Sequence, residues 1–173
     1  GNPGVMAVTA QLLGTETGRA LALGNLDTDP AIDLLVATGS GGALRTWLNT
    51  GRALFQAGPV WPELPGGATG VALVNFDGDR DLDVLSTGGV ANRLWINEGH
   101  PPFGGTGHFQ DSGQDLGDVG WGPIAVADFD GDGDADFVLA TRLREPVRFT
   151  DLSERLAIKL SALPGYLSRA HFQ

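Results

Sequence analysis

Short apolar runs recur along most of the chain and are separated by acidic and glycine-rich stretches. Three of them, at 34–37, 84–86 and 137–140, contain β-branched or aromatic residues and are followed by Thr. Short runs of this kind, bounded by turn residues, are typical of buried strands rather than helices. A second set of apolar segments, at 18–23, 70–74 and 122–127, begins with Gly and lies just upstream of the acidic stretches. The pattern therefore predicts pairs of strands joined by acidic loops.

The whole unit repeats with a fixed register. Asn75 follows Asn25 by 50 residues and Asp128 follows Asn75 by 53, a period found in propellers and solenoids. Residues 45–51 (Arg-Thr-Trp-Leu-Asn-Thr-Gly) are matched by 93–99 (Arg-Leu-Trp-Ile-Asn-Glu-Gly), and the Phe-Gln pair at 55–56 is matched at 109–110. Each repeat thus carries about four strand-like segments, as a propeller blade requires. We expect an all-β fold with about three four-stranded antiparallel blades.

The acidic loops at 25–33, 75–83 and 128–136 share one spacing, with Asp or Asn at positions one, three and five and Asp at position nine. Two unit charges about 4 Å apart repel by roughly 4 kcal/mol at an effective dielectric near 20, so a divalent cation would relieve the crowding. Oxygen ligands in an irregular loop suit Ca²⁺ better than Mg²⁺. An EF-hand would close with Glu at position twelve, where this chain has Val36, Ser86 and Leu139.

Residues 124–140 (Ile-Ala-Val-Ala-Asp-Phe-Asp-Gly-Asp-Gly-Asp-Ala-Asp-Phe-Val-Leu-Ala) resemble the FG-GAP/VCBS repeats of integrin-like β-propellers. The resemblance covers about 20–150. It implies up to three Ca²⁺ ions, held by the side chains at positions one, three, five and nine and by the position-seven carbonyl. The ligands implied are Asn25, Asp27, Asp29, Ala31 and Asp33 in loop one, Asn75, Asp77, Asp79, Asp81 and Asp83 in loop two, and Asp128, Asp130, Asp132, Asp134 and Asp136 in loop three.

The first loop departs from this pattern, because Leu26, Thr28 and Pro30 stand where the family usually has Phe, Gly and Gly. Loop one contains three carboxylates, loop two four and loop three five. We expect the affinity for calcium to rise in that order.

The repeat pattern fades after residue 140. Asp151 and Glu154 have the spacing of a helix capping box, and leucines recur at 152, 156, 160, 163 and 167 with helical spacing. We therefore divide the chain into propeller repeats at 1–150 and a C-terminal segment at 151–173 with one helix. A competing interpretation makes the final Phe172-Gln173 the echo of the earlier Phe-Gln pairs, in a distorted last strand.

Charge and composition narrow the range of partners. The formal charge is −10, and 12 of the 21 acidic residues lie in the three loops. Three calcium ions would bring that charge to −4. Without a basic patch, nucleic acid is not an expected partner.

No apolar run is long enough to span a bilayer. Zero cysteines exclude disulfides. Loops of this type in extracellular proteins bind calcium at roughly 10⁻⁴–10⁻³ M, which favours an extracellular, cell-surface or periplasmic location.

Three blades are fewer than the four to eight or so with which propellers usually close. We expect the chain to be part of a larger propeller. The alternatives are that several copies associate to close a ring or that the blades stack as an open array. Of the four tryptophans, Trp47 and Trp95 have equivalent positions that indicate blade core. Trp61 and Trp121 lie in connecting segments and are the better candidates for a surface platform.

Two classes of function fit these features. The first is a non-catalytic, calcium-stabilised recognition or adhesion module that binds a protein or a glycan. The alternative is the propeller portion of a secreted polysaccharide-acting lyase or hydrolase. That class requires a convergent cluster of His, Lys, Arg or Tyr, whereas the chain has one Tyr and three scattered His. We therefore expect no catalytic residues.

Overall fold

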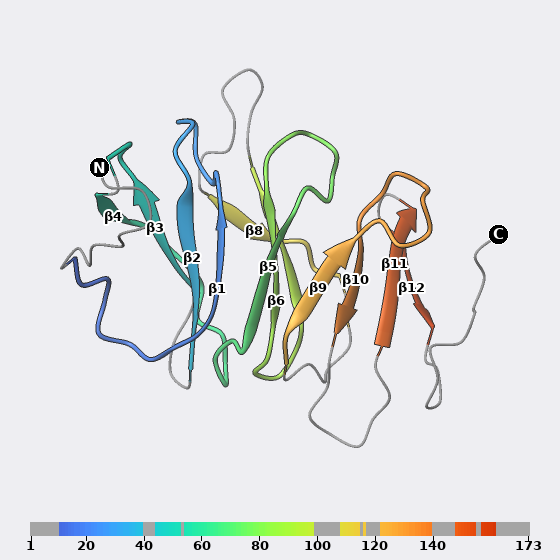
Figure 1. Cartoon of the computed structure of the whole chain (residues 1–173). Coiled ribbons are helices and arrows are strands. Elements are labelled where there is room, and N and C mark those ends of the chain that lie inside the picture. Colours follow the sequence, from blue (N-terminus) through green and yellow to red (C-terminus); the bar gives the residue numbers. More distant parts are fainter. Residues whose placement is uncertain are drawn as a thin grey trace, which may run out of the picture.

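The computed structural model describes residues 11–39, 44–52, 54–98, 108–114, 116, 122–139, 148–154 and 157–161. These residues form twelve β-strands in three four-stranded antiparallel sheets (Figure 1). The described part of the chain contains no helix of the length and apolar character needed to cross a membrane. The expectation of an all-β fold with four-stranded antiparallel sheets is confirmed.

Each sheet is a simple meander in which consecutive strands pair. The first sheet contains β1 (Gly18–Gly24), β2 (Asp33–Thr38), β3 (Leu44–Asn49) and β4 (Phe55–Val60). The second contains β5 (Gly70–Val74), β6 (Asp83–Thr87), β7 (Arg93–Asn97) and β8 (Phe109–Asp111). The third contains β9 (Ile124–Ala127), β10 (Asp136–Leu139), β11 (Arg148–Glu154) and β12 (Ala157–Ser161).

The strand register repeats from sheet to sheet. Leu34 pairs with Leu23 on one side and with Trp47 on the other. In the second sheet, Val84 pairs in the same way with Leu73 and Trp95. Residues directly opposite each other on antiparallel strands share a face, so the first two sheets present equivalent rows of side chains on the same side.

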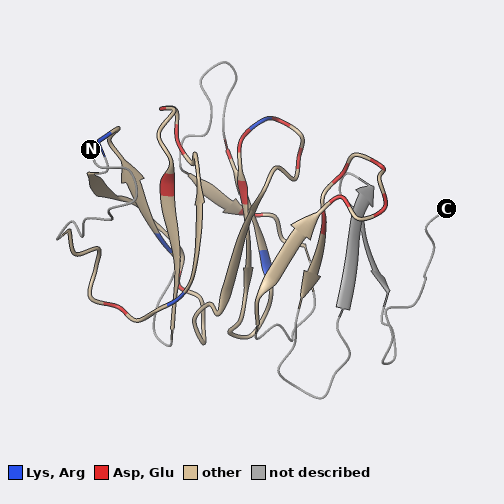
Figure 2. Cartoon of the chain, in the orientation of Figure 1, with Lys and Arg blue, Asp and Glu red and all other residues tan. Residues whose placement is uncertain are grey.

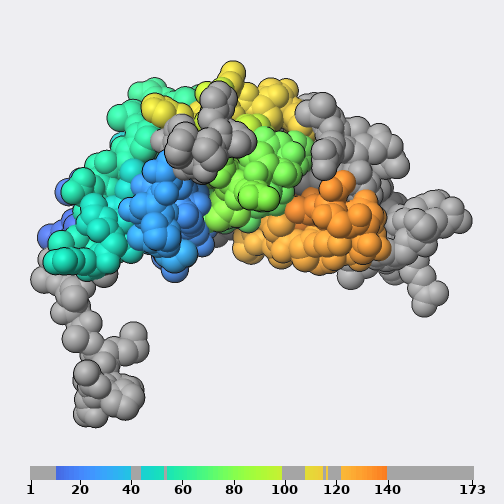
Figure 3. Space-filling model, turned by 90° about the horizontal axis from the view of Figure 1, so that it is seen from above, coloured from blue at the N-terminus to red at the C-terminus, as the bar shows by residue number. Residues whose placement is uncertain are grey.

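The three sheets lie one after another, with β5 next to β1 on one side and next to β9 on the other (Figures 1 and 3). Gly70, at the start of β5, explains the close approach of the second and third sheets at this point. A Cβ on Gly70 would lie 2.5 Å from the carbonyl oxygen of Gly122, just before β9. The first strands of the sheets thus lie together, as the inner strands of propeller blades do.

Two hydrophobic clusters join the sheets. The cluster between the first and second sheets contains Leu26, Leu35, Ala37, Leu44, Trp61, Leu64, Ala68, Val71, Val84 and Trp95. The cluster between the second and third sheets contains Val74, Leu85, Leu94, Leu116 and Phe137. Most of the core therefore lies between sheets, and the second sheet uses its two faces for two different neighbours.

Trp61 forms the centre of the first cluster. Only 4% of its surface is exposed, and its ring stacks on Phe109 with 4.4 Å between centroids. It meets the ring of Trp95 edge-on at 5.5 Å. Its indole N–H donates to the Thr46 hydroxyl at 2.6 Å. Trp61 is therefore a core residue and not a surface platform, whereas the expectation of a buried Trp95 is confirmed.

The helix expected at 151–173 is not found in the part of that segment that the structure describes. Residues 151–154 belong to β11 and residues 157–161 form β12. Without β11, the edge of β10 would expose unpaired backbone N–H and C=O groups, and pairing Phe137 with Thr150 and Val138 with Phe149 satisfies them. This tertiary pairing outweighs the helical spacing of the leucines. Phe172 and Gln173 lie outside the described residues.

We expect Trp61→Ala to reduce the free energy of unfolding by about 3–5 kcal/mol, because it removes the ring that fills the space between two sheets. Urea denaturation followed by circular dichroism measures this loss. Trp61→Phe should cost less, since an aromatic ring would still stack on Phe109. A loss below about 1 kcal/mol for the alanine variant would contradict the proposed role of this ring.

Candidate metal centres

The three acidic loops lie at equivalent places in the three sheets. Residues 25–32 join β1 to β2, residues 75–82 join β5 to β6, and residues 128–135 join β9 to β10. Figure 2 shows these loops, with their acidic residues in red, at the same edge of the molecule. The repeat seen in the sequence therefore places all three candidate metal centres on one rim.

Side-chain oxygens of the loops hold the loop backbone in a series of tight turns. In loop one, the Asp29 N–H donates to Asp27 Oδ1 at 2.8 Å and the Ala31 N–H donates to Asp29 Oδ1 at 2.7 Å. The bonds at the same positions are Asp79 to Asp77 (3.1 Å) and Asp81 to Asp79 (2.8 Å) in loop two, and Asp132 to Asp130 (3.1 Å) and Asp134 to Asp132 (3.0 Å) in loop three. A carboxylate has two oxygens, so one can fix the turn while the other binds an ion.

The aspartate at position nine of each loop is fully buried, with 0% of its surface exposed in Asp33, Asp83 and Asp136. Its Oδ2 accepts the N–H of loop position two, which is Leu26 (2.7 Å), Phe76 (2.7 Å) or Phe129 (2.8 Å). In the first two sheets its Oδ1 accepts the N–H of Asn49 or Asn97, both at 2.8 Å. The predicted ligand at position nine therefore also ties the loop to two strands, a role that the spacing alone did not reveal.

Asn97 connects the loops of two neighbouring sheets. Its side-chain amide donates to the carbonyl of Leu26 in loop one and to that of Leu82 in loop two, both at 3.3 Å. Asn97 is 1% exposed, so these bonds are shielded from water. Asn97, at the end of β7, thus joins the two loops through its side chain and binds Asp83 of its own sheet through its backbone N–H.

Loop three brings three carboxylates together. Single carboxylate oxygens of Asp128, Asp130 and Asp136 lie within 4.8 Å of one another. Calcium binds oxygen at about 2.3–2.6 Å, so two ligands of one ion can be up to about 5 Å apart. The donor set is all oxygen, as a hard cation prefers. The residues present therefore fit a calcium ion bound by positions one, three and nine.

Among the described residues, loops one and two contain no comparable group of three carboxylates. Both begin with an Asn, so position one provides an amide oxygen. Asn25 Oδ1 accepts the N–H of Asp27 at 3.2 Å, whereas Asn75 Oδ1 accepts that of Gly78 at 2.8 Å. The role of the position-five side chains and of the position-seven carbonyls of Ala31, Asp81 and Asp134 as ligands stays a prediction.

Burial and mutual repulsion act on the carboxylates of these loops. Burial and, to a smaller extent, the nearby charges of Asp77 and Asp79 raise the pKa of Asp83 to about 6. The hydrogen bonds from the backbone N–H groups of Asn97 and Phe76 act in the opposite direction. Burial also raises the pKa of Asp27 and of Asp77. Protonation of Asp83 therefore stabilises the folded state at low pH, and this contribution is lost as the pH rises through about 6. At neutral pH the loop holds a buried negative charge that a bound cation would neutralise.

Loops two and three share a backbone feature that loop one lacks. Positions four and six have positive φ in both, at Gly78 (76°) and Arg80 (108°) and at Gly131 (81°) and Gly133 (97°). Loop one has Thr28 and Pro30 at these positions, and neither has a positive φ. The sequence departure noted in the first loop thus corresponds to a different backbone path.

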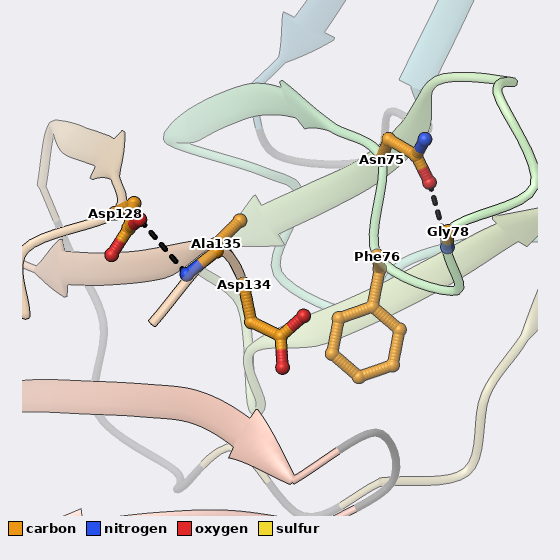
Figure 4. A pocket seen from close by; sticks show the side chains of 7 residues that line it. Asn75, Phe76, Gly78, Asp128, Asp134 and Ala135 are labelled. Carbon is orange, nitrogen blue, oxygen red and sulfur yellow. Dashed lines mark hydrogen bonds between the residues drawn. The ribbon is translucent and has the colours of Figure 1, made fainter. Parts of the chain in front are cut away.

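A groove lies between loops two and three (Figure 4). Its volume is about 370 Å³, and it is lined by Asn75, Phe76, Gly78, Asp128, Gly133, Asp134 and Ala135. Figure 4 shows the Phe76 ring and the Asp134 carboxylate among the side chains that line it. No local sequence pattern indicates this groove, because it forms only when two loops 53 residues apart become neighbours. Trp121, the other proposed surface platform, lies outside the described residues.

Arg80 is the only non-glycine residue with positive φ in the described part of the chain. Such a conformation costs about 1–3 kcal/mol for a residue with a side chain, while glycine costs about 0.5–1 kcal/mol in entropy. We expect Arg80→Gly to stabilise the protein by about 1 kcal/mol, seen as a rise of about 2–4 °C in melting temperature. Arg52→Gly is the matched control, because it removes the same charge from an exposed turn with no such φ. An equal shift in both variants would show that charge, and not backbone strain, is responsible.

Comparison with protein families gives one match, to the FG-GAP-like repeat, at residues 25–86 and 75–139. The two matches overlap, and together they include all three loops. No curated protein and no solved structure matches the chain significantly. The matched segments cover well over half of the 173 residues and begin at the first residue of loops one and two. The chain belongs to the FG-GAP-like repeat family.

Proposed function

We propose that the protein is a calcium-stabilised recognition module whose ligand, a protein or a glycan, binds at the rim formed by the acidic loops. The observation that carries the metal part of this proposal is the group of three carboxylates in loop three, with oxygens within 4.8 Å of one another. Membership of the FG-GAP-like repeat family supports it, since the matched segments include each of the loops.

In loop three, Asp128, Asp130 and Asp136 would hold the ion. A bound Ca²⁺ supplies positive charge that neutralises the carboxylates. Asp136 has a further role, because its Oδ2 accepts the Phe129 N–H at 2.8 Å and so fixes the second residue of the loop. The chain thus couples ion binding to the shape of the loop, and an ion bound only by the native loop stabilises the fold by mass action.

The groove between loops two and three is the contact surface that we propose for the ligand. One wall carries Asn75 and Phe76 and the other carries Asp128 and Asp134. An aromatic ring beside carboxylate and amide groups suits a sugar, whose C–H face packs on the ring while its hydroxyls bond to the polar groups. The same groups could accept a basic side chain of a protein through charge and cation–π contact.

We place this module outside the cytosol, as a part of an adhesion-type protein. The argument is the calcium affinity expected of such loops, about 10⁻⁴–10⁻³ M, which only extracellular calcium concentrations would satisfy. Recognition by a rim of loops on a rigid scaffold is also the way in which many binding domains work.

Calcium binding predicts a change in stability. We expect excess EDTA to lower the melting temperature of the calcium-loaded protein by several degrees, because the carboxylates are then left to repel one another. Asp130→Asn should reduce both this shift and the number of ions bound in calorimetric titration. Glu63→Gln removes an exposed charge outside the loops and should leave both unchanged. Identical melting with and without EDTA would contradict a structural metal.

Ligand recognition is tested on a glycan array with the intact chain in calcium buffer. We expect bound glycans to be lost in EDTA and in the Phe76→Ala variant, because the first disorders the groove walls and the second removes the stacking ring. Val90→Ala is the control, since Val90 is 61% exposed and does not line the groove. Binding that persists in both EDTA and the Phe76 variant would place recognition elsewhere on the protein.

A further inference from the structure

The first sheet has one apolar face that no other sheet covers in the described structure. Leu21 and Leu23 on β1 are 65% and 62% exposed, although both are large aliphatic residues in a well-formed strand. The register places Leu23, Leu34 and Trp47 in one row across β1, β2 and β3. Leu34 and Trp47 are only half-buried. We call the four residues Leu21, Leu23, Leu34 and Trp47 the open face of the first sheet.

The second sheet shows what covers a face of this kind. By register, its equivalents of the open face are Val71, Leu73, Val84 and Trp95. Val71 is 9% exposed, Val84 0% and Trp95 2%, and all three belong to the cluster that also contains Leu35, Ala37 and Leu44 of the first sheet. Leu73 packs against the same cluster. The face is therefore built to pack on the opposite side of a neighbouring sheet.

The complementary surface is present at the other end of the same chain. Ala22 and Leu35 pair in the first sheet, and Ala72 and Leu85 pair in the second. Both pairs pack against the sheet that follows. Their equivalents in the third sheet are Ala125 and Val138, which pair in the same register. Ala125 is exposed and Val138 is half-buried. One end of the molecule thus presents the first half of an inter-sheet contact and the other end presents the second half.

We propose that two copies of this chain associate head to tail, with the open face of the first sheet of one copy packed on the Ala125–Val138 face of the third sheet of the other. Such a contact is heterologous, and with two copies it can occur twice and close a ring. Two copies bring six sheets, within the range of about four to eight at which propellers close. A second copy is the occupant that the structure favours, since the chain itself supplies both halves of the contact.

The charged residues near the open face are compatible with this packing. Arg45 pairs with Val36 in the next row of the sheet, and its guanidinium is 3.3 Å from Glu16. Arg93 occupies the equivalent place in the second sheet and forms an ion pair with Asp111 while the first and second sheets pack together. An ion pair of this type at the margin therefore does not prevent a sheet from docking.

Sedimentation equilibrium of the intact chain in calcium buffer, across a range of micromolar concentrations, tests the proposal. We expect the wild type to have twice the monomer mass at the upper concentrations. Leu21→Asp combined with Leu23→Asp should give a monomer with near-native circular dichroism, because both side chains are largely exposed within one copy. Val90→Asp places the same charge on an exposed apolar residue away from this face and should remain a dimer.

Ala125→Arg tests the other half of the contact. It should also weaken the dimer when studied alone, whereas a contact between two open faces of the first sheet would leave it unaffected. A mixture of the Ala125 variant with the Leu21/Leu23 double variant should recover a mixed dimer, since each contributes one intact face. A monomeric wild type at all concentrations would overturn the proposal, as would a dimer that tolerates the Leu21/Leu23 changes.

Discussion

A buried carboxylate that accepts two backbone N–H groups is the contact on which the architecture of the first two sheets depends. Asp83 illustrates it, because one oxygen binds Phe76 in the loop and the other binds Asn97 at the end of β7. Three separate points of the chain meet at this side chain. Losing it would leave two buried donors without partners, at a cost of about 1–3 kcal/mol each. Only an acidic side chain offers both acceptors and a negative charge in so little space.

The same aspartate connects stability with metal binding. Burial raises the pKa of Asp83 to about 6, so at neutral pH the second loop holds a charge that the fold does not favour by itself. A cation bound at the loop would remove that cost, and the remaining loop carboxylates form turns with one oxygen while the other is available to an ion. The architecture of these repeats and the ion binding that we propose would therefore depend on the same atoms.

Much of this arrangement could be predicted from sequence because it is periodic and local. The three loops, the strands on either side of them and the buried Trp95 follow from spacing and from apolar runs. The C-terminal strands could not be foreseen, since the leucines at 152, 156 and 160 fit a helix and only the unpaired edge of β10 decides against it. The burial of Trp61 and the groove beside Phe76 depend on which sheets become neighbours. The sequence contains no local pattern for either.

The amide of Asn97 donates to carbonyl groups in two successive loops, Leu26 in the first and Leu82 in the second. A single planar group with two donors can satisfy both acceptors only while the loops keep one mutual orientation. A distortion of loop one or loop two should therefore be transmitted to the other, and we expect the first two repeats to unfold together. The two repeats thus share a stabilising contact that neither repeat could form alone.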